Sequence, residues 1–234
     1  TADGSDTVAL TADVVPPVVW RGGPGSDRLA LTGTGAPIVV DQSISTLAQD
    51  GHATHTVTEV ESQDVDVAGS RVTVRGTDAA DTMRYAPSGA YAGTITMDGD
   101  GRTLSVSRVG GVQGVSGGTL ELDPAGGDDT VAVDATTGGD HIAIFRGAAV
   151  VTQVGETLPV RAVAGTESLV VNGRSGDDRF VVNGEGGTAT ITVDGGVHTA
   201  GDRISFAAAQ SSAAVTLDAA PASGTLAAGG PAIA

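Results

Sequence analysis

The chain of 234 residues contains no cysteine, and all 12 of its basic residues are arginines, so lysine is absent too. Without cysteine the chain has no disulfides, no thiolate metal sites and no cysteine nucleophile. Without lysine it has no Schiff-base chemistry and no lysine-based phosphate loop. Aromatic residues make up only 3% of the chain. Several common kinds of enzyme site are therefore excluded, and the core must be built from aliphatic residues.

Positive charge is scarce as well, because 28 acidic residues give a net charge of −16. Binding to nucleic acid or to an anionic membrane surface depends on many Lys and Arg contacts. No run of 18 apolar residues is present, so we expect no membrane-spanning segment. We therefore expect neither a nucleic-acid partner nor a membrane span, whereas a divalent cation or a solvated extracellular surface would suit this charge.

What the chain does have is glycine and short aliphatic alternations. Glycine numbers 36, and 40% of the residues are hydrophobic, mostly Val, Ala, Ile and Leu. Short alternating runs separated by Gly and Asp are typical of strands joined at frequent corners. The sequence predicts an all-β fold.

One stretch has a recognisable corner motif. Residues 22–30 fit the nonapeptide G-G-x-G-x-D-x-U-x, in which U is a large apolar residue. Gly23 and Gly25 allow the positive φ angles of a tight corner. The corner turns its carbonyls inward and Asp27 adds a carboxylate, and such hard oxygen ligands suit Ca²⁺. Leu29 then begins a strand that points into the core.

The core of this motif, Asp-x-U-x-U after small residues, recurs along the chain. Its seven copies begin at Asp6, Asp27, Asp81, Asp129, Asp140, Asp178 and Asp202. The shortest spacings, 27 − 6 = 21 and 202 − 178 = 24, suit one coil of roughly 20–25 residues. Spacings of 48 and 49 residues before Asp129 and before Asp178 suggest two coils each. Strict alternation predicts burial of Val8, Leu10, Leu29, Leu31, Val131, Val133, Ile142 and Ile144, with Arg28 and Thr130 facing outward.

These repeats predict a parallel β-solenoid of stacked coils, like a β-helix or β-roll, over residues 1–206. Residues 34–58 lack the corner motif and are interpreted as an irregular insertion or coil. Residues 207–234, rich in Ala, Gly and Pro, are a weak last coil, a linker or a segment exchanged with another chain. The alternative fold is a pair of β-sandwich domains.

The nonapeptide resembles the calcium-binding repeats of extracellular bacterial RTX, or hemolysin-type, proteins. The Gly-Asp-Asp corners before alternating strands are more loosely similar to large surface β-solenoid adhesins. The resemblance implies a β-roll or parallel β-helix, secretion and calcium-assisted folding. It makes Asp27, Gly23 and Gly25 the first candidates for a calcium site, followed by Asp129 and Asp178. The other interpretation of these corners is that Asp side chains bond neighbouring backbone amides.

We expect a non-catalytic structural or adhesive module of a secreted or cell-surface bacterial protein. Its partners would be other copies of itself, flanking parts of a longer chain, or a surface glycan. One alternative is a calcium-dependent folding module of an exported protein, with Ca²⁺ as its cofactor. Another is a β-helical polysaccharide-active enzyme, although Trp20, Tyr85 and Tyr91 are the only Trp and Tyr residues available to stack on sugars.

Overall fold

The computed structural model describes residues 4–13, 16–43, 45–98, 102–109, 120–145, 150–154, 160–163, 166–183 and 189–206. The described residues form strands and connecting segments without a helix, which confirms the all-β prediction. In particular, this part of the chain contains no helix long and apolar enough to cross a membrane.

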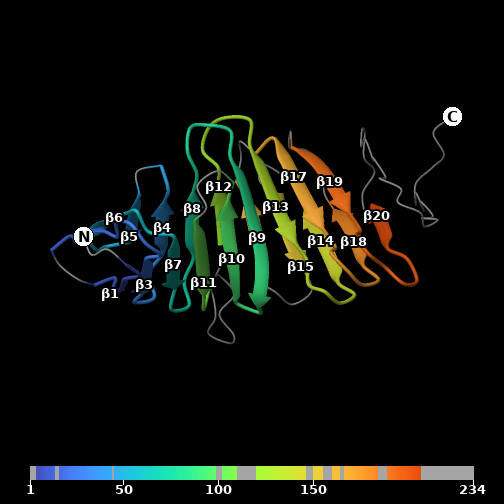
Figure 1. The fold of residues 1–234 in the computed structure, drawn as a ribbon. Helices are drawn as coiled ribbons and strands as arrows, with labels where there is room; N and C mark the ends of the chain where they lie inside the picture. The colour runs from blue at the N-terminus through green and yellow to red at the C-terminus, as the bar shows by residue number, and fades with distance from the viewer. Residues whose placement is uncertain are drawn as a thin grey trace.

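The strands belong to two open, mixed sheets. The order of the nine-stranded sheet is β1 (Thr7–Thr11), β3 (Arg28–Thr32), β7 (Ser62–Asp66), β11 (Thr103–Ser107), β10 (Ala92–Met97), β9 (Thr82–Gly89), β13 (Thr130–Asp134), β17 (Ser168–Asn172), β19 (Thr190–Asp194). The order of the eleven-stranded sheet is β2 (Val19–Arg21), β6 (Thr54–Thr58), β5 (Thr46–Gln49), β4 (Ile38–Asp41), β8 (Val72–Arg75), β12 (Leu120–Asp123), β16 (Val160–Ala162), β15 (Val150–Val154), β14 (His141–Phe145), β18 (Arg179–Asn183), β20 (Arg203–Phe206). The strands lie side by side from the N-terminal to the C-terminal end (Figure 1).

The chain passes back and forth between the sheets, and three antiparallel meanders interrupt this alternation. They are β4–β6, β9–β11 and β14–β16. In each, the first strand pairs in parallel with a later strand of the same sheet. The third strand returns to pair in parallel with an earlier one. Each meander therefore adds three strands to one sheet, and its middle strand is the antiparallel one.

The meanders correct two predictions from the sequence. Residues 34–58, interpreted as irregular, contain the regular strands β4, β5 and β6. The 48 residues from Asp81 to Asp129 do not span two coils, because β9 and β13, which follow these residues, are direct neighbours. The additional length is taken up by the rest of the meander, β10 and β11, and by β12 in the other sheet.

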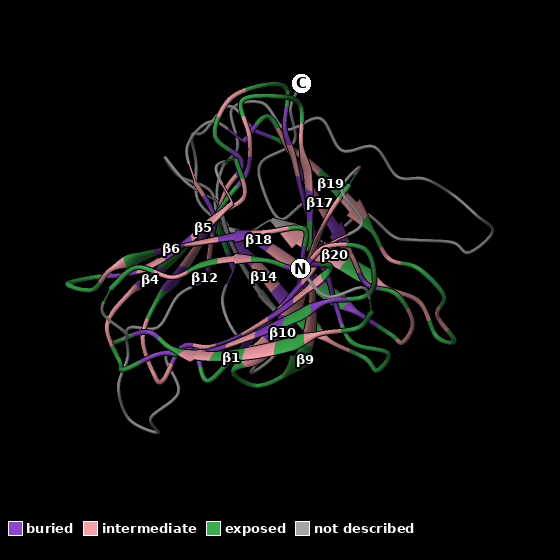
Figure 2. Ribbon diagram, turned by 60° about the vertical axis from the view of Figure 1, so that its left-hand side comes forward, coloured by how far each residue is buried: buried purple, intermediate pink, exposed green. Residues whose placement is uncertain are grey.

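The core lies between the two sheets and follows the predicted alternation. Leu29, Leu31, Val131, Val133, Ile142 and Ile144 are buried as predicted. Val8 and Leu10 are only half-buried, because β1 is an edge strand of its sheet. Arg28 is exposed and Thr130 is half-buried. The buried apolar residues form one cluster, and Figure 2 shows buried residues distributed along the strands of both sheets.

The core is less well covered at the C-terminal end of the sheets. Ile191 and Val193 on β19 are half-buried, whereas their register partners Leu169 and Val171 on β17 are buried. Ile204 on β20 is also half-buried. Within the described residues, the stack therefore ends with apolar surface still partly open.

Candidate functional site

An acidic residue stands immediately before each of nine parallel strands, and these residues form three rows. The rows are Asp6, Asp27 and Glu61 before β1, β3 and β7; Asp81, Asp129 and Glu167 before β9, β13 and β17; and Asp140, Asp178 and Asp202 before β14, β18 and β20. We call these rows the carboxylate ladders. The predicted metal ligands Asp27, Asp129 and Asp178 are the central members of three different ladders, so the structure does not bring them together.

Each ladder is held by hydrogen bonds in both directions. In the third, the N–H of Asp140 donates to Asp178 Oδ1 at 2.7 Å, and the N–H of Asp178 donates to Asp202 Oδ1 at 2.8 Å. In return, the N–H groups of Arg179 and Arg203 donate to the carbonyls of Asp140 and Asp178. The side-chain bonds of the other ladders are Asp6 to Asp27 (2.9 Å), Asp27 to Glu61 (2.7 Å), Asp81 to Asp129 (2.9 Å) and Asp129 to Glu167 (2.9 Å).

The ladders have a simple physical origin. A backbone N–H at a corner has left the regular strand pairing, and a buried N–H without an acceptor is costly. Alternation places the residue before the strand on the core side, where its carboxylate reaches the preceding corner. The exposed Glu61 and Glu167 extend their longer side chains to the same kind of N–H. The Asp-x-U-x-U pattern includes neither residue, although the sequence from Glu167 to Val171 matches it when Glu is allowed at the first position.

The central aspartates each have one oxygen without a partner. Asp27, Asp129 and Asp178 are each only 1% exposed, and no group in the described residues bonds to their Oδ2 atoms. By contrast, Asp81 Oδ2 accepts bonds from the N–H and hydroxyl of Thr77, and Asp140 Oδ2 accepts the same pair from Thr136. The residues four positions before the central aspartates are not threonines, so no hydroxyl is available there.

The corners before the central aspartates share one backbone shape. Four residues before the aspartate, Gly23, Ala125 and Arg174 have φ angles of 106°, 75° and 67°. Two residues before it, a glycine has a φ of 130–148° in all three corners. These glycines are Gly25, Gly127 and Gly176. The incomplete motifs at Asp129 and Asp178 therefore keep a left-handed residue where the motif's second glycine has been lost.

Close stacking also explains why a glycine stands two residues before each central aspartate. A Cβ on Gly25 would overlap the carbonyl of Gly4, and one on Gly176 would overlap the backbone of Gly138. Successive corners thus touch through their backbones, as the hydrogen bonds of the ladders require.

Crowded charge affects the ladder carboxylates. Burial raises the pKa of Asp178, and the nearby Asp202, Asp140 and Asp177 raise it further, against the bond from Asp140. Burial and neighbouring acids raise the pKa of Asp129 in the same way. The exposed Asp177 behaves in the opposite manner: bonds from the N–H groups of Ala200, Thr199 and Gly201 lower its pKa. At Asp129 and Asp178, the fold therefore makes the protonated form more favourable than it is for a free carboxyl.

The corners give a cation fewer ligands than the motif suggested. No group of three His, Cys, Asp or Glu residues within the described ranges could hold a metal. Calcium takes six to eight oxygens, whereas each corner presents one unbonded carboxylate oxygen. At Asp27 this Oδ2 lies beside Gly22, 2.5 Å from the place of a Cβ on that glycine. Backbone carbonyls would have to supply most of a coordination shell there.

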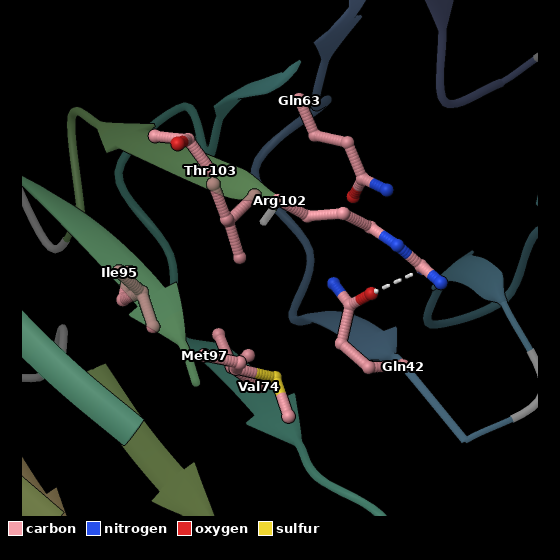
Figure 3. A pocket seen from close by; sticks show the side chains of 8 residues that line it. Gln42, Gln63, Val74, Ile95, Met97, Arg102 and Thr103 are labelled. Carbon is pink, nitrogen blue, oxygen red and sulfur yellow. Dashed lines mark hydrogen bonds between the residues drawn. The ribbon is translucent and has the colours of Figure 1, made fainter. Parts of the chain in front are cut away.

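A small, mainly apolar hollow with a few polar side chains lies between the sheets near one end of β10 and β11. Arg102 donates to Gln42 Oε1 at 3.1 Å (Figure 3), while Gln63 is buried and its Oε1 has no partner among the described residues. The interior of about 10 Å³ suits one water molecule rather than an organic ligand. The lining consists of Gln42, Gln63, Val74, Ile95, Met97, Arg102, Thr103 and Leu104.

Comparisons with known proteins identify no relative of this chain. No protein-family model matches the chain, and neither a curated protein nor a solved structure does. The function has to be inferred from the residues and geometry described above.

Proposed function

We propose that the chain is a structural module of a secreted or cell-surface bacterial protein, folded as a β-solenoid in which carboxylate ladders join successive coils. The observation that carries this proposal is the repeated ladder, in which one coil's backbone N–H bonds the carboxylate of the next. Such bonds connect neighbouring coils only, as in a quasi-one-dimensional repeat protein.

The continuity of the sheets favours a solenoid over two β-sandwich domains. The nine-stranded sheet runs from β1 to β19 and the eleven-stranded sheet from β2 to β20. Two sandwich domains would interrupt both sheets at a linker, but strands from the two halves of the chain pair in both. The pairs β9–β13 and β8–β12 cross the middle of the stack.

The partly open ends support continuation of the stack. Edge strands present unpaired backbone groups to any further strand. At the C-terminal end, Ile191 and Val193 are half-buried and would be covered by one more coil. We infer that the partner at these ends is a flanking part of a longer chain or another copy of this one. Residues 207–234, the proposed exchanged segment, lie outside the described residues.

Small-angle X-ray scattering at several concentrations tests this proposal. A solenoid gives the scattering of one elongated particle with a constant cross-section, and assembly lengthens that particle as concentration rises. Two globules joined by a linker would refute the solenoid. Self-assembly would be refuted if the particle length did not change with concentration either for the full chain or for a variant lacking residues 207–234.

A second candidate, a calcium-dependent folding module similar to the RTX repeats, is favoured by the unbonded Oδ2 atoms of the three central aspartates. A ligand that binds only the folded state raises the melting temperature by mass action. Calcium should then raise the melting temperature of the wild type, and Asp27→Ala should remove much of the rise. A melting temperature that is the same in millimolar calcium and in chelator would eliminate this candidate.

A further inference from the structure

Among the arginines that the structure describes, two have no side-chain partner within the described residues. Neither Arg179 nor Arg203 bonds to a side chain in the described residues. Nine other arginines do so, eight of them with a carboxylate and Arg102 with Gln42. These nine are Arg21, Arg28, Arg71, Arg75, Arg84, Arg102, Arg108, Arg161 and Arg174.

The two unpaired arginines are direct neighbours. His141 on β14 is the register partner of Arg179 on β18, which is in turn the partner of Arg203 on β20. All three side chains are exposed on the solvent face of the eleven-stranded sheet. We call them the basic row. Neighbouring strands are about 4.8 Å apart, and like charges directly opposite one another destabilise a sheet.

Acids close to the basic row do not neutralise it by direct bonding. The aspartate before each strand points to the core side, and its N–H or carboxylate takes part in the third ladder. The carboxylate of Asp177, the nearest exposed acid in the sequence, accepts three backbone N–H groups. In a chain with a net charge of −16, adjacent arginines without a side-chain partner in the described ranges are candidates to bind an external anion.

The surface beside the basic row is suited to an extended ligand. Two residues further along each strand, the same face carries the half-buried side chains Ala143, Val181 and Ser205, which are register partners. Beyond Ala143 on β14, Phe145 is 48% exposed. Cationic groups, a low floor of small residues and an aromatic ring therefore follow one another across the same face.

We propose that the outer face of β14, β18 and β20 binds a carboxylated polysaccharide. The planar guanidinium forks of Arg179 and Arg203 match carboxylate groups in bidentate geometry. The ring of Phe145 offers an apolar surface to the C–H face of a sugar. Nucleic acid fits less well, because its dense phosphates need many more cations than this acidic chain presents. The proposal depends on the register of three strands and is independent of the structural role proposed above.

The test measures binding of polygalacturonate to the full chain by calorimetry at low ionic strength. The double variant Arg179→Gln/Arg203→Gln is compared with the control Arg28→Gln. Arg28 also follows a corner aspartate, Asp27, but it lies in the nine-stranded sheet and pairs with Asp64 of that sheet. The double variant should bind on the order of 100-fold more weakly, about tenfold per arginine, and the control within about twofold of wild type. Phe145→Ala should also weaken binding.

Melting temperatures close to wild type will show that the variants are folded. The proposal is overturned if wild type does not bind, or if Arg28→Gln loses as much affinity as the double variant. Equally tight binding of polyglutamate, a sulfated polysaccharide or single-stranded DNA would also overturn it, since recognition would then be of charge alone. Scattering by the double variant reports separately on the proposed solenoid, so the two proposals can fail independently.

Discussion

Replacing Asp178 by Ala or by Asn separates its role as an acceptor from any role of its charge. Asp178 Oδ1 accepts the N–H of Asp140 at 2.7 Å, and its Oδ2 is buried without a partner. Asp178→Ala removes the acceptor and leaves the N–H of Asp140 unbonded. Asp178→Asn keeps an acceptor Oδ1, removes the negative charge and puts an amide NH2 group in the place of Oδ2.

The two changes should differ clearly in the free energy of unfolding. An unsatisfied buried donor costs about 1–3 kcal/mol, so we expect Asp178→Ala to destabilise the protein by that amount. Because burial raises the pKa of Asp178, its ionised form is less favourable in the folded protein than in the unfolded chain. Asp178→Asn weakens the hydrogen bond from Asp140 but also removes the cost of burying an ionised carboxylate. We therefore expect its free energy of unfolding to fall by less than about 1 kcal/mol.

Urea unfolding at pH 7 in the presence of chelator, followed by circular dichroism, measures both variants. Asp50→Ala is the control, because Asp50 is exposed and its carboxylate bonds to no group in the described part of the chain. It should stay within about 0.5 kcal/mol of wild type. Asn as damaging as Ala in chelator would refute the acceptor role. Equal damage only in calcium would identify a cation at this corner.

Gly176→Ala should destabilise by about 2–5 kcal/mol, because its Cβ would overlap Gly138 at a φ of 130°. Gly201 has a φ of 110° but open space around the place of a Cβ, so Gly201→Ala should destabilise by only about 1 kcal/mol. Equal melting temperatures for the Gly176→Ala and Gly201→Ala variants would contradict close stacking. The raised pKa values of Asp129 and Asp178 add stability that is fully present below about pH 4 and is lost as pH rises through the raised values. The double variant Asp129→Asn/Asp178→Asn should therefore lack part of the free energy of unfolding that these two groups add to the wild type between pH 7 and pH 4. Urea titrations at several pH values measure this, and parallel curves of unfolding free energy against pH would contradict it.

The sequence predicted which face of a strand is buried. Its one-coil spacings also predicted the neighbours β1–β3 and β18–β20, but the strands of the meanders were not predicted. Alternation at Leu29 and Leu31 determines the inward side, because successive side chains point to opposite faces. The same alternation occurs in the antiparallel strands β5 and β10, so it could not distinguish a meander from successive coils. Strand neighbours depend on contacts between distant residues, and a single sequence contains little information about them.

The corner aspartates, and the interpretation that they bond backbone amides, came from the sequence, but the distant partners in those bonds did not. Asp27 was singled out as a metal ligand because its motif has calcium-binding relatives. In the structure its Oδ1 accepts the N–H of Asp6, and its own N–H donates to Glu61, 34 residues away. No local pattern links Glu61 to Asp27, since β4–β6 lie between them in the chain.

Amide hydrogen exchange measured by NMR in the presence of chelator tests the ladders most directly. The N–H groups of Asp81, Asp129, Asp140 and Asp178 each donate to the carboxylate of the next member of their ladder. If these bonds join the coils, the four amides exchange slowly, with protection close to that of the neighbouring strand amides, and calcium changes little. Rapid exchange in chelator, with protection appearing only when calcium is added, would contradict the account.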